Sequence, residues 1–107
     1  MAGLTSAITT TFKKELLEGD HDFNNGADTF KIALFKANSS ISGTYGAATT
    51  NYSDVTGNSD ETTGTGYSSG GNTLTNVDPT TSGTTAFTDF ADTSWTSATF
   101  TTRGAII

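Results

Sequence analysis

The sequence predicts a mainly β protein, namely an antiparallel β-sandwich or jelly-roll-like domain with one short N-terminal amphipathic helix. Threonine is β-branched and favours strands, and the chain holds 24 Thr and 11 Ser among its 107 residues. Twelve glycines interrupt the chain at short intervals, and there is only one proline. Seven Phe, three Tyr and one Trp are spread along a chain that is only 33% hydrophobic, so aromatic side chains must supply the core.

The length fits one domain over residues 1–107, because two independent cores would each be too small to outweigh chain entropy. Within it we expect a helix over about residues 6–18 and a β-rich region over about residues 29–107. This region either lacks C-terminal strands or shares them with another subunit.

The helix is predicted from a four-residue repeat. Ile8, Phe12 and Leu16 form one apolar stripe, and Lys13 and Lys14 lie outward. A helix of about three turns is marginal alone, so the stripe must dock on the sheet or on a neighbouring subunit. We therefore predict that these three apolar residues bind a partner.

The ends of this helix have their own signals. Thr5 or Ser6 can accept a hydrogen bond from a free amide of the first turn, and Gly19 suits the left-handed position that closes a helix. The following segment, residues 20–28, has the composition of a turn.

Strict alternation over residues 29–37 is the strongest strand signal, and it predicts a central strand. Residues 38–71 are rich in Ser, Thr, Gly and Asn, which predicts long loops with short edge strands. A further strand is predicted over residues 72–77, with Leu74 inward and with Asp78 and Pro79 ending it.

Residues 86–91 and 95–103 both alternate and are predicted to pair as a hairpin. The sequence then ends on Ile106 and Ile107, although a free terminus is normally polar. This apolar pair indicates that the strand continues, pairs with another chain or has been cut. We predict that both isoleucines are buried against a partner.

Composition excludes several classes of function. Eleven acidic residues against five basic ones give a net charge of −6, which argues against nucleic-acid binding. There is no cysteine, the apolar runs are too short to span a membrane, and the N-terminus lacks the pattern of a signal peptide. From Ala37 to Thr102 there is no Lys or Arg, so this stretch is either a solvated acidic surface or one that faces a basic partner.

His21 lies between Asp20 and Asp22 and could serve as a general base oriented by a carboxylate. No Ser-bearing elbow or oxyanion-type glycine turn stands at a recognisable spacing, so a solvated loop histidine is the preferred interpretation. We predict no catalytic residue and no enzymatic activity.

Residues 20–26 carry oxygen ligands at alternate positions, which is how calcium loops begin. The pattern fails where an EF-hand loop requires Gly and Glu, because Asn25 and Lys31 occupy those positions. A capped turn is therefore predicted here, with no metal site and no cofactor.

Tyr45, Tyr52 and Tyr67, together with Trp95, could form a stacking platform for sugar rings. The alternative is that aromatic residues build the core, and this is preferred for Trp95. The three tyrosines remain candidate ligand-binding residues.

Four stretches of the chain resemble a family of small virion structural proteins of tailed bacteriophages. They lie in the same order as in that family and cover about half of the chain. The stretches are Thr10 to Gly19 (TTFKKELLEG), Asp28 to Phe35 (DTFKIALF), Gly64 to Val77 (GTGYSSGGNTLTNV) and Thr85 to Ile107 (TAFTDFADTSWTSATFTTRGAII). Members of the family continue past the position of Ile107 with further strand-like sequence, which this chain does not show.

The resemblance implies a non-enzymatic particle component that is present in many copies. We expect a capsid decoration or cement protein on the capsid exterior, made in the host cytoplasm. Its expected partners are the major capsid protein and copies of itself, in a homo-oligomer or a symmetric assembly, without nucleic acid or membrane. The alternatives are a tail or fibre module that binds a host-surface glycan and a tail-tube or neck component.

Overall fold

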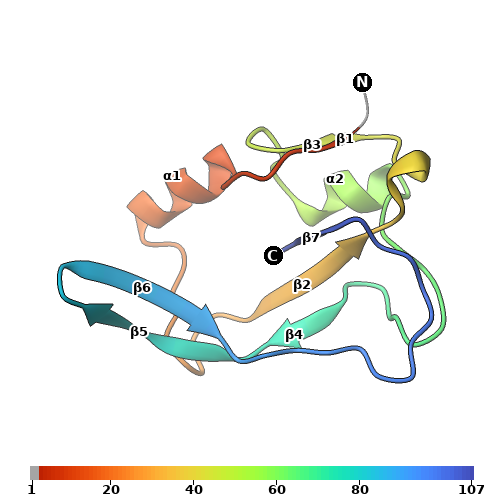
Figure 1. Cartoon of the computed structure of the whole chain (residues 1–107). Helices are drawn as coiled ribbons and strands as arrows, with labels where there is room; N and C mark the ends of the chain where they lie inside the picture. Colours follow the sequence, from red (N-terminus) through yellow and green to blue (C-terminus); the bar gives the residue numbers. More distant parts are fainter. Residues whose placement is uncertain (1–2) are drawn as a thin grey trace.

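The computed structural model describes residues 3–107, including every side chain of that range except that of Asn38. Most of its ordered elements are strands (Figure 1). In chain order they are β1 (Gly3–Leu4), α1 (Thr10–Glu18), β2 (Phe30–Phe35), a 3-10 turn (Asn38–Ser40), β3 (Thr44–Tyr45), α2 (Tyr52–Gly57), β4 (Asn72–Leu74), β5 (Asn76–Ser82), β6 (Thr85–Phe90) and β7 (Gly104–Ile106).

The strands form three small sheets. β2 lies between β4 and β7 in an antiparallel three-stranded sheet, β5 and β6 form an antiparallel hairpin, and β1 pairs with β3 in parallel. The central position predicted for the strand at residues 29–37 is thus confirmed. A β-rich class with antiparallel sheets is confirmed as well, but the chain has two short helices where one was predicted.

Helix α1 begins later than predicted. The Thr9 side chain, and not that of Thr5 or Ser6, caps it by accepting a hydrogen bond from the Phe12 amide at 3.2 Å. The Thr5 amide instead donates to the Tyr45 carbonyl at 2.9 Å, which keeps the chain extended beyond β1. The end of the helix is as predicted, because Gly19 adopts the left-handed conformation with φ 78°.

Helix α2 lies in the segment that was predicted to be loop. Its composition is poor for a helix, but the Asp54 carboxylate accepts hydrogen bonds from the amides of Thr50 and Asn51 at 2.9 and 3.3 Å. The Asn-x-x-Asp spacing of Asn51 and Asp54 is the sequence signal for such a start. Val55 anchors the helix in the core.

The predicted hairpin between residues 86–91 and 95–103 is wrong, because the first of these segments pairs with a different strand. β6 pairs with β5, and residues 95–103 form no strand but a single bridge between Thr99 and Thr65. Pro79 does not end β5, because a shift in register between Val77 and Thr80 accommodates it. The connection to β6 turns at Gly83, where φ is 60°.

The core is small and partly aromatic. Its central cluster contains Phe35, Ile41, Tyr45 and Val55, with Leu4 and Ile106 packed against it. Leu74 is buried, as predicted from its position in the strand at residues 72–77. A further group joins Trp95 to Tyr67 and Phe100, with ring centroids 6.2 and 6.3 Å apart, and Trp95 is half-buried against these rings.

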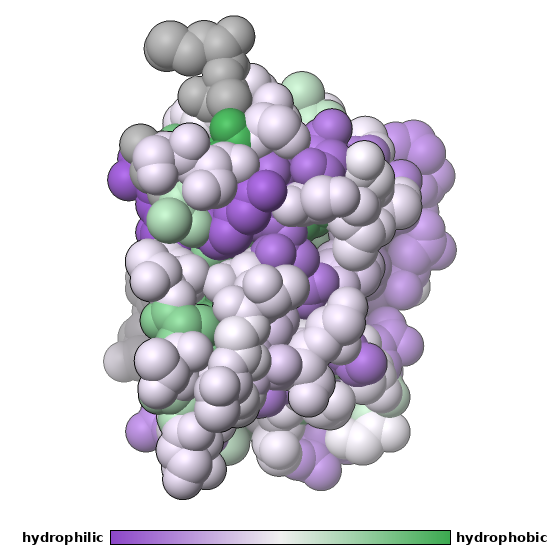
Figure 2. Space-filling view, turned by 90° about the vertical axis from the view of Figure 1, so that its right-hand side faces the viewer, coloured by the Kyte–Doolittle hydropathy of each residue, from purple (hydrophilic) through white to green (hydrophobic). Residues whose placement is uncertain are grey.

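The face that lies to the right in Figure 1 is mostly hydrophilic or neutral, with small and separated hydrophobic areas (Figure 2). Several large hydrophobic side chains of the described chain are exposed. They are Ile8, Leu16, Leu17, Tyr52, Val77, Phe87 and Ile107. No helix within residues 3–107 has the length and apolar character needed to cross a membrane.

Candidate interaction groove

A groove of about 420 Å³ lies where α1, β2, β7 and the start of α2 meet. Its walls come from segments that are far apart in the sequence. They include Phe12, Glu15, His21, Lys31, Ala33, Thr49 to Tyr52, Gly70, Ile106 and Ile107. The groove therefore combines the helix with the C-terminal strand, the two regions for which the sequence predicted partner binding.

The pairing of β7 with β2 places the apolar wall of the groove. Ile106 lies opposite Ala33 in the antiparallel register, and Ile107 follows directly after the strand. β7 is an edge strand of this sheet, so its end lies beside open space and not under another strand. Ile107 is exposed and gives the groove an apolar rim.

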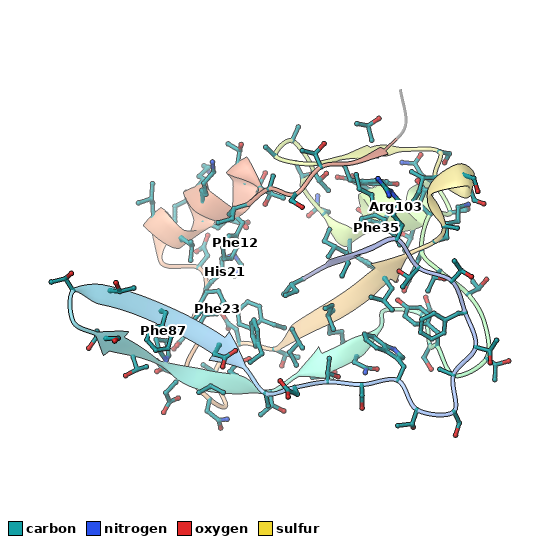
Figure 3. All side chains as sticks on the ribbon, in the orientation of Figure 1. Phe12, His21, Phe23, Phe35, Phe87 and Arg103 are labelled. Atoms are coloured by element: carbon teal, nitrogen blue, oxygen red, sulfur yellow. The ribbon has the colours of Figure 1, made fainter. Side chains whose placement is uncertain are left out.

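An aromatic column supports the opposite wall. The His21 ring lies 4.9 Å from that of Phe12, which in turn meets Phe23 edge-on at 6.0 Å. Phe23 stacks on Phe30 at 4.5 Å, so α1 and β2 are joined through rings. Phe12, His21 and Phe23 of this column are labelled in Figure 3. Phe12 is therefore half-buried: it lines the groove, and its contacts with these rings hold the helix in place.

A polar pair stands in this wall. The Nε2 atom of His21 lies 3.1 Å from the Glu15 carboxylate, and both side chains are partly buried. This carboxylate comes from the helix, and not from Asp20 or Asp22 as the sequence suggested. The groove therefore carries one acid–histidine pair beside the basic side chain of Lys31.

The floor near α2 is fixed by Glu61. Its carboxylate accepts hydrogen bonds from the hydroxyls of Tyr52 and Tyr67, the latter at 2.8 Å, and from the Gly70 amide at 2.6 Å. Burial disfavours the charge of Glu61, but these hydrogen bonds outweigh it and lower its pKa. Burial, together with Glu61, raises the pKa of Tyr67 to about 12.

A second carboxylate, Asp60, lies wholly inside the protein. It accepts hydrogen bonds from the Tyr45 hydroxyl at 2.5 Å and from the amides of Ser42 and Gly43 at 2.9 and 2.8 Å. Lys36 adds an ion pair at 3.6 Å. Burial alone would raise the pKa of Asp60, but these donors outweigh it and hold the pKa at about 2.

The structure brings together half of the residues that the sequence singled out. Phe12, Tyr52, Ile106 and Ile107 all line the groove. Leu16 is exposed on the helix, and Ile8 precedes the helix and is exposed as well.

The other two tyrosines do not face the groove. Tyr45 is only 5% exposed and belongs to the core, so its ring is not accessible for stacking against a sugar. Tyr67 is held by Glu61 and by neighbouring aromatic rings.

Sequence reasoning missed several residues that matter here. Glu15 and Lys31 line the groove, and Leu17 is 91% exposed on α1. Leu17 lies outside the four-residue apolar repeat of its helix and follows Lys13 by one turn. This position beside a lysine was the sequence signal that could have placed Leu17 on the exposed side.

The segment at residues 20–28 is a capped turn. The Asp22 carboxylate accepts a hydrogen bond from the Asn24 amide at 3.0 Å, and Gly26 has φ 81°. Within the described residues 3–107, no three His, Cys, Asp or Glu side chains gather in a way that could hold a metal ion.

Comparison of the chain with family models, with curated proteins and with solved structures finds no match.

Proposed function

We propose that this protein is a non-enzymatic structural protein of a tailed-bacteriophage virion, specifically a decoration or cement protein on the capsid exterior. The observation that carries this proposal is the set of large apolar side chains left exposed around a small core, among them Leu17 and Ile107. A subunit of an assembly buries such side chains against its neighbours, which removes their apolar area from water. The resemblance of four segments to virion proteins supports the same role.

The groove supplies a docking site for the major capsid protein. Ile106 and Ile107 give it an apolar rim, and Leu16 and Ile8 extend the apolar surface along and before the helix. On a particle the partner surface is present at high local concentration, so a modest contact area suffices for stable occupancy. This role requires no catalytic residue, metal, cofactor, nucleic acid or membrane.

The sandwich or jelly-roll arrangement belongs to this proposal. β7 is an edge strand, and a hollow of about 280 Å³ separates it from the extended residues that follow β1. A strand from a neighbouring subunit that added to this edge would enlarge the sheet into a sandwich-like layer. The protein, made in the host cytoplasm, would then complete its fold during assembly.

The test is to locate and count the protein on intact virions. Immunogold labelling or density mapping gives the location, and gel densitometry against the major capsid protein gives the copy number. Hundreds of copies on the head are expected of a decoration protein. A few copies, or a label confined to the tail, would contradict the capsid assignment.

Amide exchange on intact particles tests the docking site itself. The backbone amides of Ile106 and Ile107 are expected to exchange much more slowly on particles than in the free protein, because capsid contact would cover them. Equal exchange in the two states would remove the C-terminal strand from the interface.

One observation favours a second role as a glycan-binding module of a tail or fibre. Tyr52 is 40% exposed and lines the groove beside Thr50, Asn51 and Lys31, so an aromatic face stands next to hydrogen-bonding groups. Calorimetry with cell-wall saccharides of the host tests this role. Binding that Tyr52→Ala abolishes would support it, and no binding at saturating sugar would end it.

A further inference from the structure

The β5–β6 hairpin is attached to the protein only near its base. The Asn25 amide donates to the Asp78 carboxylate at 2.7 Å, and the Phe90 ring lies 5.6 Å from that of Phe30. From Val77 to Asp89 every residue of the two strands is exposed, and the hairpin extends away from the three-stranded sheet (Figure 1). A two-stranded hairpin is marginal alone in water, so a partner that covered this arm would stabilise it.

The two faces of the hairpin differ. Phe90 turns toward the protein, and side chains alternate along a strand, so Phe87 and Asp89 lie on the opposite, outer face. Val77 pairs with Asp89 across the ladder and shares that face. The outer face thus presents two exposed apolar side chains with an acid between them, in a part of the chain that lacks Lys and Arg.

Helix α1 presents the complementary chemistry. Phe12 and Glu15 contact His21, whereas Lys13 and Leu17 are exposed on the outer side of the helix. Lys13 lies one turn before Leu17, so a cation and an exposed leucine are neighbours on the helix surface. The outer face of α1 therefore combines Leu17 with the positive charge of Lys13, while Lys14 and Glu18 form an ion pair beside them at 3.2 Å.

We propose that a second copy of this chain docks here, with the outer hairpin face of one copy on the outer face of α1 of the next. Two symmetric contacts are also conceivable, hairpin on hairpin and helix on helix, but charge favours hairpin on helix. Hairpin on hairpin would bring Asp89 against Asp89, and helix on helix would bring Lys13 against Lys13. Hairpin on helix pairs Asp89 with Lys13 and covers Phe87 with Leu17.

Such a head-to-tail contact uses two different surfaces, so it repeats from copy to copy and produces a ring or a filament. The interface rests on the proposed role as a many-copy structural subunit. Its test uses the isolated protein, without any particle, so the capsid assignment and this interface can fail separately.

The experiment is sedimentation velocity with light scattering on purified protein over a concentration series. Wild-type protein is expected to self-associate, and Leu17→Asp, Lys13→Glu and Asp89→Lys are each expected to weaken the association about tenfold or more. Asp92→Lys is the matched control, since it makes the same charge change beyond the hairpin and is expected to have little effect. Circular dichroism verifies that each variant is folded.

Mixing the two charge-reversed variants gives the decisive result. In a mixture of Lys13→Glu with Asp89→Lys, each hairpin meets a helix of opposite charge in the other variant, so association is expected to return. A wild-type protein that stays monomeric throughout, or folded variants whose mixture stays as weak as each alone, would overturn the proposal. An Asp92→Lys effect as large as that of Asp89→Lys would overturn it too. If Asp89→Lys does not fold, Leu17→Asp decides the question. Association of this variant as strong as that of the wild type would overturn the proposal.

Discussion

The Tyr45 hydroxyl donates a hydrogen bond of 2.5 Å to the Asp60 carboxylate, and through this contact β3 is joined to the loop that follows α2. Both side chains are buried, and the same carboxylate also binds the chain just before β3. A single acid therefore organises the part of the protein that contains the core cluster.

Asp60→Asn is expected to lower the free energy of unfolding by about 3 kcal/mol, because an amide nitrogen would then face donors that need an acceptor. Urea unfolding followed by circular dichroism measures this. Asp92→Asn, at an exposed position, is the control and should change little. Equal stability of the two variants would contradict the role given to Asp60.

Acid should destabilise the protein through the same residue. The pKa of Asp60 is about 2 in the folded protein and 3.8 as the ordinary value, so the unfolded chain takes up the proton first as the pH falls. Its contribution is therefore complete above about pH 4 and is lost toward pH 2, a decrease of about 2 kcal/mol. Urea unfolding at a series of pH values measures the loss, and Asp60→Asn should show a correspondingly shallower pH dependence.

Two substitutions on α1 should differ in their effect on stability, because one side chain packs against the protein and the other is exposed. Phe12→Asp is expected to cost about 2 kcal/mol of stability, because it places a charge among the rings of His21 and Phe23. Leu17→Asp is expected to change stability by less than about 0.5 kcal/mol. Thermal unfolding compares them, and a larger loss for Leu17→Asp would show that the two faces of the helix are wrongly assigned.

Gly71 should tolerate no side chain. It has φ 71°, and a Cβ at this position would collide with the carbonyl of Ile32 in the central strand. Gly71→Ala is expected to cost about 3 kcal/mol or more. Gly57→Ala, in open space at the end of α2, should instead raise stability by up to about 1 kcal/mol. Chemical unfolding of both variants tests the contrast.

Local patterns predicted the elements whose signals are contained in one segment. Alternation marked β2, and Gly19 marked the end of α1. Pairing partners could not be predicted in this way, because they depend on contacts between distant segments. The residues before α1 run beside residues 45–47, through hydrogen bonds of the Thr5 and Thr10 amides, and the sequence of the segment does not reveal this pairing.

The groove, too, depends on contacts between distant segments that local patterns cannot predict. Its apolar members Phe12, Ile106 and Ile107 were predicted from patterns on separate segments, and the fold brought them together. The Glu15–His21 pair was missed because it forms across the end of a helix and not between sequence neighbours. Tyr45 was chosen for its residue type alone, and its burial follows from packing that composition does not reveal.

The position of β2 in the sheet has a consequence for the kinetics of folding. The central strand β2 ends at Phe35, whereas its partners β4 and β7 begin only at Asn72 and Gly104. Pairing between such distant segments requires large loops to close first, which slows folding. The apolar stretch from Ile32 to Phe35 therefore stays without its strand partners until β4 and β7 have been synthesised, and it is exposed to aggregation until then.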